Sequence, residues 1–106
     1  MANTYVNAKV DLTATSVTTL YTCAGLTTGI VKSMLVSEDT GNADTITVTI
    51  TNGSTVYSLF KTQAVGANTT VELLTAPLVV QAGEILKVTA ATANRLHVVA
   101  SILEIT

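Results

Sequence analysis

The stretch from Thr45 to Phe60 constrains the fold most strongly, because it alternates threonine with aliphatic residues. The aliphatic side chains fall at every second position, at Ile46, Val48 and Ile50. A period of two puts them on one face of a β-strand. Asn52 and Gly53 follow, and both tolerate the positive φ that a tight type I′ turn requires. The run from Val56 to Phe60 then returns to β-branched and aromatic residues, so the sequence predicts a β-hairpin.

Further β-prone runs occur at roughly ten-residue spacing along the whole chain, separated by turns rich in Gly, Asn, Asp and Ser. They cover residues 3–12, 17–23, 30–36, 70–74, 78–81, 85–90 and 95–105. Eight or nine short strands with this spacing predict an all-β antiparallel sandwich or barrel. An apolar stripe of helical period is missing, so we expect little or no α-helix. Residues 1–106 are predicted to form a single β-sandwich domain, in which residues 1–12 are a first strand or an N-terminal arm.

The chain is poor in charge, with 11% charged residues in 106, against about 25% in a typical domain. Its apolar runs are too short for a transmembrane helix, and its first residues do not resemble a signal peptide. We therefore expect a soluble protein, made in the cytoplasm and without a membrane partner. Since little charge keeps the copies apart, we also expect other subunits to cover part of its surface.

The few cations are scattered rather than clustered: Lys9, Lys32, Lys61, Lys87 and Arg95. Phosphate binding needs clustered cations, so a nucleic-acid partner is not expected. The single cysteine, Cys23, has no partner for a disulfide or a metal motif and reads as a small apolar residue.

His97 is the one histidine of the chain and lies in the middle of a predicted strand. A general base needs an orienting carboxylate or a nucleophile nearby, and no sequence motif supplies one. We therefore expect His97 to be a surface or interface residue, and the protein not to be an enzyme.

The acidic turn from Glu38 to Asp44 is the one candidate for a metal site, through the carboxylates of Glu38, Asp39 and Asp44. Its spacing does not match a calcium-binding loop, and an ordinary solvated turn has the same composition. We expect no metal and no cofactor.

Three longer runs resemble small all-β virion proteins of tailed bacteriophages. They are residues 19–27 leading into 30–36, residues 73–88 and residues 93–105. The resemblance covers residues 17–105 and concerns the order of strands and turns. Cys23 departs from it, since such sequences have Pro there.

The resemblance implies a jelly-roll-like sandwich in the virion, as a capsid decoration (cement) protein. Such a protein binds the major capsid protein on the outer capsid surface as a homotrimer. The alternative is a tail or fibre domain that binds a host glycan. Sugar sites rely on aromatic faces, and the chain offers Tyr5, Tyr21, Tyr57 and Phe60 but no Trp.

Strands that are apolar on both faces are the natural contacts between subunits. On this basis we predict interface residues within the strands and in the N-terminal segment: Tyr5, Val6, Val31, Leu35, Val99, Leu103 and Ile105.

Overall fold

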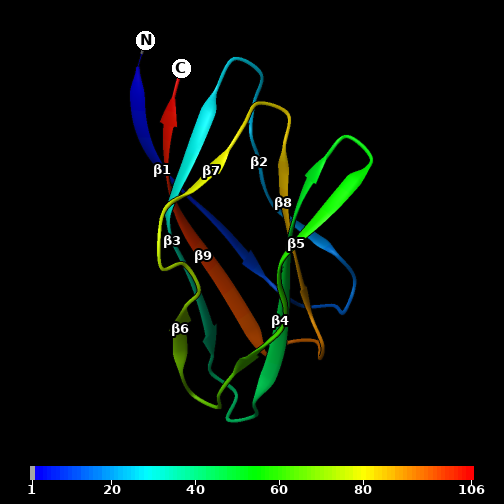
Figure 1. Cartoon of the computed structure of the whole chain (residues 1–106). Coiled ribbons are helices and arrows are strands. Elements are labelled where there is room, and N and C mark those ends of the chain that lie inside the picture. Colours follow the sequence, from blue (N-terminus) through cyan, green and yellow to red (C-terminus); the bar gives the residue numbers. More distant parts are fainter. Residues whose placement is uncertain (1) are drawn as a thin grey trace.

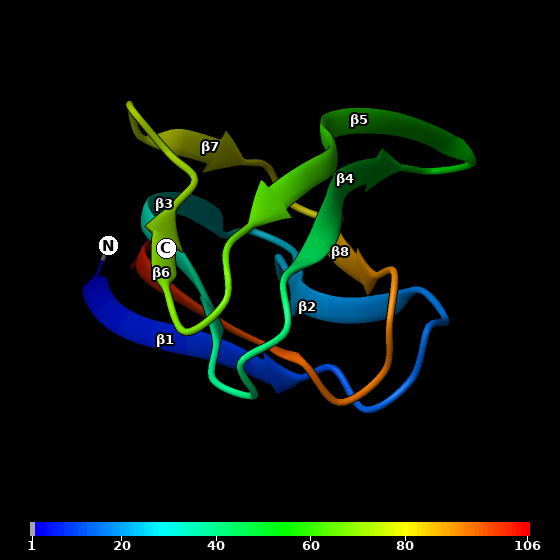
Figure 2. The ribbon, with the colours of Figure 1, turned by 90° about the horizontal axis from the view of Figure 1, so that it is seen from below.

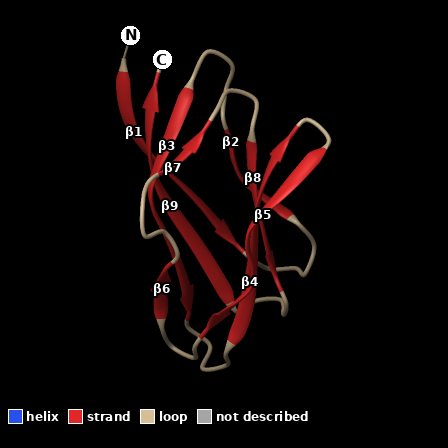
Figure 3. Ribbon diagram, viewed as in Figure 1, coloured by secondary structure: helices blue, strands red, loops and turns tan. Residues whose placement is uncertain are grey.

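The computed structural model of the chain describes residues 2–106, which form nine β-strands and no helix (Figures 1 and 3). The strands are β1 (Asn3–Asp11), β2 (Thr18–Thr22), β3 (Thr28–Glu38), β4 (Asp44–Asn52), β5 (Thr55–Val65), β6 (Thr70–Glu72), β7 (Leu78–Val80), β8 (Ile85–Ala90) and β9 (Leu96–Ile105). Residues 2–106 contain no helix long and apolar enough to cross a membrane.

The strands form two antiparallel sheets that pack face to face (Figure 2). The first sheet has the order β1-β9-β3-β6, and β7 pairs with β3 along the same edge as β6. The second sheet has the order β2-β8-β4-β5. Because the chain crosses repeatedly from one sheet to the other, the arrangement is jelly-roll-like. The predicted all-β sandwich is therefore confirmed.

The core lies between the sheets and takes alternate side chains from each strand. From β9 it takes Leu96, Val98, Ala100 and Ile102, and from β4 and β8 it takes Ile46, Val48, Leu86, Val88 and Ala90. The threonines of β4 between these positions are only partly buried, on the other face of the sheet. Burial of the aliphatic set is the main stabilising contribution to a sandwich of this size.

The N-terminal segment belongs to the first sheet of its own chain. β1 pairs with β9 along its whole length, from Asn3 opposite Ile105 to Asp11 opposite His97. The main chain of Ala2 exchanges two hydrogen bonds with that of Thr106, so the two ends lie side by side (Figure 1). Asn3–Asp11 therefore form a strand of their own chain's sheet, whereas Met1, which the prediction for residues 1–12 also covered, lies outside the described residues.

Tyr21 of β2 connects the second sheet to the first. Its hydroxyl donates a hydrogen bond of 2.5 Å to the Glu104 carboxylate on β9. Burial, together with this bond to an acidic partner, raises the pKa of Tyr21 far above its usual value. The ring packs against Gly29, where a Cβ atom would come within 2.9 Å of the tyrosine oxygen. A residue without a side chain is therefore required at this crossing.

The predicted hairpin is present, but its turn is displaced by one residue. Asn52 still belongs to β4 and pairs with Thr55, so the two turn residues are Gly53 and Ser54. Gly53 has φ of 61°, and a positive φ at the first turn residue alone defines type II′. The expectation of a type I′ turn at Asn52-Gly53 is therefore wrong, whereas the need for glycine at position 53 holds.

We predict that Gly53→Val destabilises the protein by at least about 1 kcal/mol, because a β-branched residue is strained at positive φ. A Cβ atom at this position would meet no neighbouring atom, so the cost is a matter of backbone conformation alone. Gly53→Asn is the matched control, since Asn tolerates positive φ. Thermal unfolding should rank the parent highest, Asn next and Val lowest. A valine variant with the melting temperature of the parent would show that position 53 is not a turn position that requires positive φ.

Candidate functional site

The outer face of the first sheet carries a continuous apolar row across four strands. Tyr5 on β1 is the register partner of Leu103 on β9, which pairs with Ile30 on β3, which pairs with Val79 on β7. Partners across antiparallel strands point to the same face and contact one another. The ends of the row face solvent most strongly, with Tyr5 75% and Val79 51% exposed.

A second apolar pair lies further along the same face. Val99 on β9 is the register partner of Leu35 on β3, and both are exposed. Lys9 on β1 and Glu72 on β6 lie at the two ends of this row. We call the row from Tyr5 to Val79 together with the Val99–Leu35 pair the outer apolar face. Contiguous exposed apolar surface of this kind marks interaction sites.

Five of the predicted interface residues lie on the outside of the first sheet: Tyr5, Leu35, Val99, Leu103 and Ile105. Val31 and Val6 do not. Val31 is completely buried, and Val6 packs against the core. Sequence reasoning missed Ile30 and Val79, although Ile30 follows from its register with Leu103 once the pairing is known.

A bulge in β3 explains why Val31 and Leu35 point in opposite directions. The two residues are four positions apart, so strict alternation would place them on the same face. The register with β9 shifts between Val31 and Ser33, because Lys32 is an extra residue at this point. An inserted residue reverses the alternation beyond it. Val31 therefore faces the core and Leu35 faces solvent.

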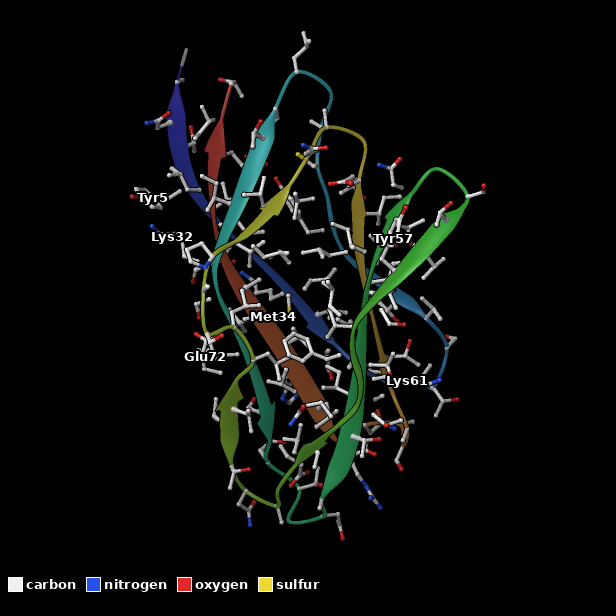
Figure 4. The ribbon with its side chains drawn as sticks, in the orientation of Figure 1. Tyr5, Lys32, Met34, Tyr57, Lys61 and Glu72 are labelled. Carbon is white, nitrogen blue, oxygen red and sulfur yellow. The ribbon has the colours of Figure 1, made fainter. Side chains whose placement is uncertain are left out.

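Glu72 fills the gap that the bulge leaves at the edge of β3. β7 pairs with β3 as far as Val31, and β6 begins to pair at Leu35. Between them, the Glu72 carboxylate accepts a 2.7 Å hydrogen bond from the main-chain N–H of Met34 (Figure 4). Burial raises the pKa of this carboxyl. Hydrogen bonds from Ser33, Met34 and Leu74 lower it by a larger amount, so the net shift of the Glu72 pKa is downward.

His97 lies on the outside of the first sheet between two carboxylates. Its Nε2 is 3.2 Å from Oδ1 of Asp11, its register partner on β1, and its Nδ1 is 3.8 Å from Oδ2 of Asp39. Sequence reasoning could not place a carboxylate beside His97, because Asp11 reaches it only through strand pairing. Both ring nitrogens face acceptors, which is the arrangement of a bridging surface histidine rather than of a base facing a nucleophile.

The acidic turn is organised by Glu38, which is buried rather than solvated. Its two carboxylate oxygens accept main-chain hydrogen bonds from Thr40, Gly41, Asn42 and Asn68, and a further bond from the Thr40 hydroxyl. Burial raises the pKa of Glu38, but the bonds from Thr40, Asn68 and Gly41 outweigh this and lower it to about 2. The carboxylate therefore joins the β3–β4 turn to the β5–β6 connection.

The three acidic residues considered as candidate metal ligands have separate partners. Glu38 binds the turn, Asp39 approaches His97, and Asp44 accepts a 3.0 Å hydrogen bond from the N–H of Thr92. Within residues 2–106, no group of three His, Cys, Asp or Glu side chains is arranged to hold a metal ion. The expectation of an ordinary solvated turn needs correction, because Glu38 is an internal hydrogen-bond acceptor.

The remaining candidates also have defined places. Cys23 is buried, and its thiol donates a 3.3 Å hydrogen bond to the carbonyl of Thr27. Tyr5 and Tyr57 are exposed on different sheets, on opposite sides of the view in Figure 4. They therefore do not form the shared aromatic platform that a glycan site would use.

The solved structures to which the chain is similar include two that are described as pentameric capsid proteins isolated from metagenomic phage sequences. Each has 23% sequence identity and a TM-score of 0.48 over 93% of this chain. The chain spans about three fifths of their length, 60% of one and 58% of the other. No protein-family model and no curated protein matches the chain.

The expectation of a homotrimer is corrected here: both neighbours are described as pentameric, and neither points to three subunits. The pentameric state is described for those two proteins. At this identity and TM-score, the likeness does not transfer their subunit number or their role to this chain.

We predict that acid destabilises the protein through Glu38. Because its pKa is lowered from 4.5 to about 2 by folding, its contribution is complete above about pH 4.5 and is lost as the pH falls toward 2. The lowered pKa of Glu72 acts in the same direction. One such group changes the folding equilibrium by at most about tenfold per pH unit. Denaturant unfolding between pH 7 and pH 2 measures this slope.

Glu38→Gln should be less stable than the parent at pH 7 and should show a shallower acid slope. Glu72→Gln is the matched comparison, because it removes a second carboxylate with fewer main-chain donors. If the parent and Glu38→Gln lose stability in parallel below pH 4.5, the role assigned to Glu38 is wrong.

We also predict that metal chelation leaves the melting temperature unchanged. The Glu38 oxygens already accept five hydrogen bonds, which occupies the lone pairs that a cation would need. Thermal unfolding with excess chelator, and then with excess calcium, tests this. A fall of several degrees that calcium reverses would show a metal site in the turn.

Proposed function

We propose that this chain is a structural, non-enzymatic component of a tailed-phage particle, namely a capsid decoration (cement) protein on the outer surface of the capsid. The observation that carries the proposal is the outer apolar face, which runs across four strands on the outside of the first sheet. The resemblance of the sequence to small virion proteins supports the assignment to a phage particle.

The outer apolar face is suited to docking on a protein surface. Covering a large aliphatic side chain contributes on the order of 1 kcal/mol or more, and several such side chains lie here in contact with one another. Between the two apolar rows lie the register partners Asn7, Ser101 and Ser33, which offer hydrogen bonds without charge. The exposed Lys32 lies at the bulge beside Ser33. A sheet face that joins apolar rows to polar side chains in this way fits a broad protein partner such as the capsid shell.

Lys9 and Glu72 flank the Val99–Leu35 pair, and further charge gathers at one end of the same sheet, around Asp11, Asp39 and His97. We assign this end to the rim of the docking surface, because rim charges set orientation and association rate more than affinity. Binding driven by the apolar rows should persist at about 1 M salt, where the range of charge interactions falls to about 3 Å.

We predict that the protein is present in hundreds of copies in each particle, as a surface-covering component must be. Quantitative mass spectrometry or a stained gel of purified particles measures this. A handful of copies would contradict decoration and would favour a tail or fibre component. Absence from the particle would contradict a virion role altogether.

Particles that lack the protein provide a second test by rebinding. Val99→Lys should weaken binding by about tenfold or more, because it places a charge within the apolar pair. The control is Thr49→Lys, which places the same side chain on the outside of the second sheet. Equal binding of the two variants would show that the first sheet is not the docking surface.

A further inference from the structure

Asn52 is followed directly by Gly53, and this pair permits a reaction within the chain itself. The main-chain nitrogen of Gly53 can attack the side-chain carbonyl carbon of Asn52, which closes a five-membered succinimide ring. The amide group leaves as ammonia, carrying away the proton of the attacking nitrogen, and water then opens the ring to aspartate or isoaspartate. Glycine favours the attack because it has no side chain to hinder it. Of the six asparagines in the chain, only Asn52 precedes a glycine.

The hairpin turn leaves the two reacting groups accessible. Asn52 is the last residue of β4 and Gly53 is the first of the two turn residues, and both are exposed. The last ladder pair of the hairpin joins Asn52 to Thr55, so the N–H of Gly53 lies beyond the ladder. A Cβ atom at Gly53 would meet nothing within 4 Å apart from its chain neighbours, so the turn is open to water.

The side-chain amide of Asn52 connects this turn to the β7–β8 turn. Its nitrogen donates a 3.2 Å hydrogen bond to the carboxylate of Glu84. The other oxygen of that carboxylate accepts a 2.7 Å bond from the main-chain N–H of Gln81, and the N–H of Glu84 donates to the carbonyl of Gln81 at 3.0 Å. Glu84 is therefore held in place by its own turn. Figure 1 shows the two turns at the same end of the second sheet.

We propose that Asn52 is a site of spontaneous deamidation, and that its product separates the β4–β5 turn from the β7–β8 turn. The reaction replaces the NH2 group that donates to Glu84 by a carboxylate oxygen that cannot donate. Two carboxylates then face each other where a 3.2 Å hydrogen bond stood, and like charges this close repel. Isoaspartate also lengthens the main chain by one CH2 group just before the turn. The reaction needs only water, so it does not depend on the proposed capsid role.

Peptide mass spectrometry of the folded protein, aged at mildly alkaline pH, tests the site. Asn52 should convert to a mixture of aspartate and isoaspartate. Asn42, which is exposed in the β3–β4 turn but is followed by alanine, is the internal control and should remain asparagine. Gly53→Asn keeps a residue that tolerates positive φ and should slow conversion at position 52 by about tenfold or more. Conversion of Asn52 no faster than that of Asn42 overturns the proposal.

Thermal unfolding of Asn52→Asp tests the consequence, because this variant carries the aspartate product from the start. It should melt below the parent at neutral pH. The loss should shrink when Glu84→Gln is added, since one of the two facing charges is then removed. Ser54→Asp is the control, because it adds a charge to the same turn but keeps the bond from Asn52 to Glu84, and it should melt close to the parent.

Two results would overturn the proposed separation of the turns. One is an Asn52→Asp variant with the melting temperature of the parent. The other is a loss that is as large with Gln at position 84 as with Glu, because the product would then not act through the Glu84 carboxylate.

Discussion

The antiparallel pairing of β3 with β9 forms the centre of the first sheet, and the other strands of that sheet are added to its two edges. It runs from Thr28 opposite Ile105 to Glu38 opposite Leu96 and joins segments about seventy residues apart in the sequence. β1 then pairs with the free edge of β9, and β6 and β7 pair with the free edge of β3. The inward side chains of the pair supply much of the core, and its outward side chains supply most of the outer apolar face.

The bulge at Lys32 gives this pair its two distinct faces. Val31 enters the core on one side of the bulge, and Leu35 joins Val99 in solvent on the other. The alternation of inward and outward side chains alone predicted the outward residues of β9 and Tyr5 of β1, since these two strands pair without a bulge. It failed for Val31, because an inserted residue is visible only when the partner strand is known. Because the pairing of the strands was also unknown, the sequence alone did not reveal that Val79 lies on the outer apolar face or that Asp11 lies beside His97.

Much of the fold could be predicted from the sequence because its strands are short, β-branched and regularly spaced. The hairpin was predicted correctly in its strands and displaced by one residue at its turn, since Asn52 and Gly53 suit two registers that differ by one position. Glu38 could not be identified as an internal acceptor, because one of its donors, Asn68, lies thirty residues further along the chain. Local pattern specifies strands well, whereas contacts between distant loops require the assembled fold.

A decoration protein that docks through the outer apolar face has the outside of its first sheet covered in the assembled particle, and thiol labelling measures whether it is. Cys23 is buried, so the parent chain provides a low background. Val99→Cys places a thiol on the outer apolar face, and Ser58→Cys places one on the exposed β5 strand of the second sheet. Both should react with maleimide in the free protein. In the particle, we predict that the thiol at position 99 is protected and that the thiol at position 58 still reacts. Equal and undiminished labelling at both positions would show that the outer face of the first sheet is not covered.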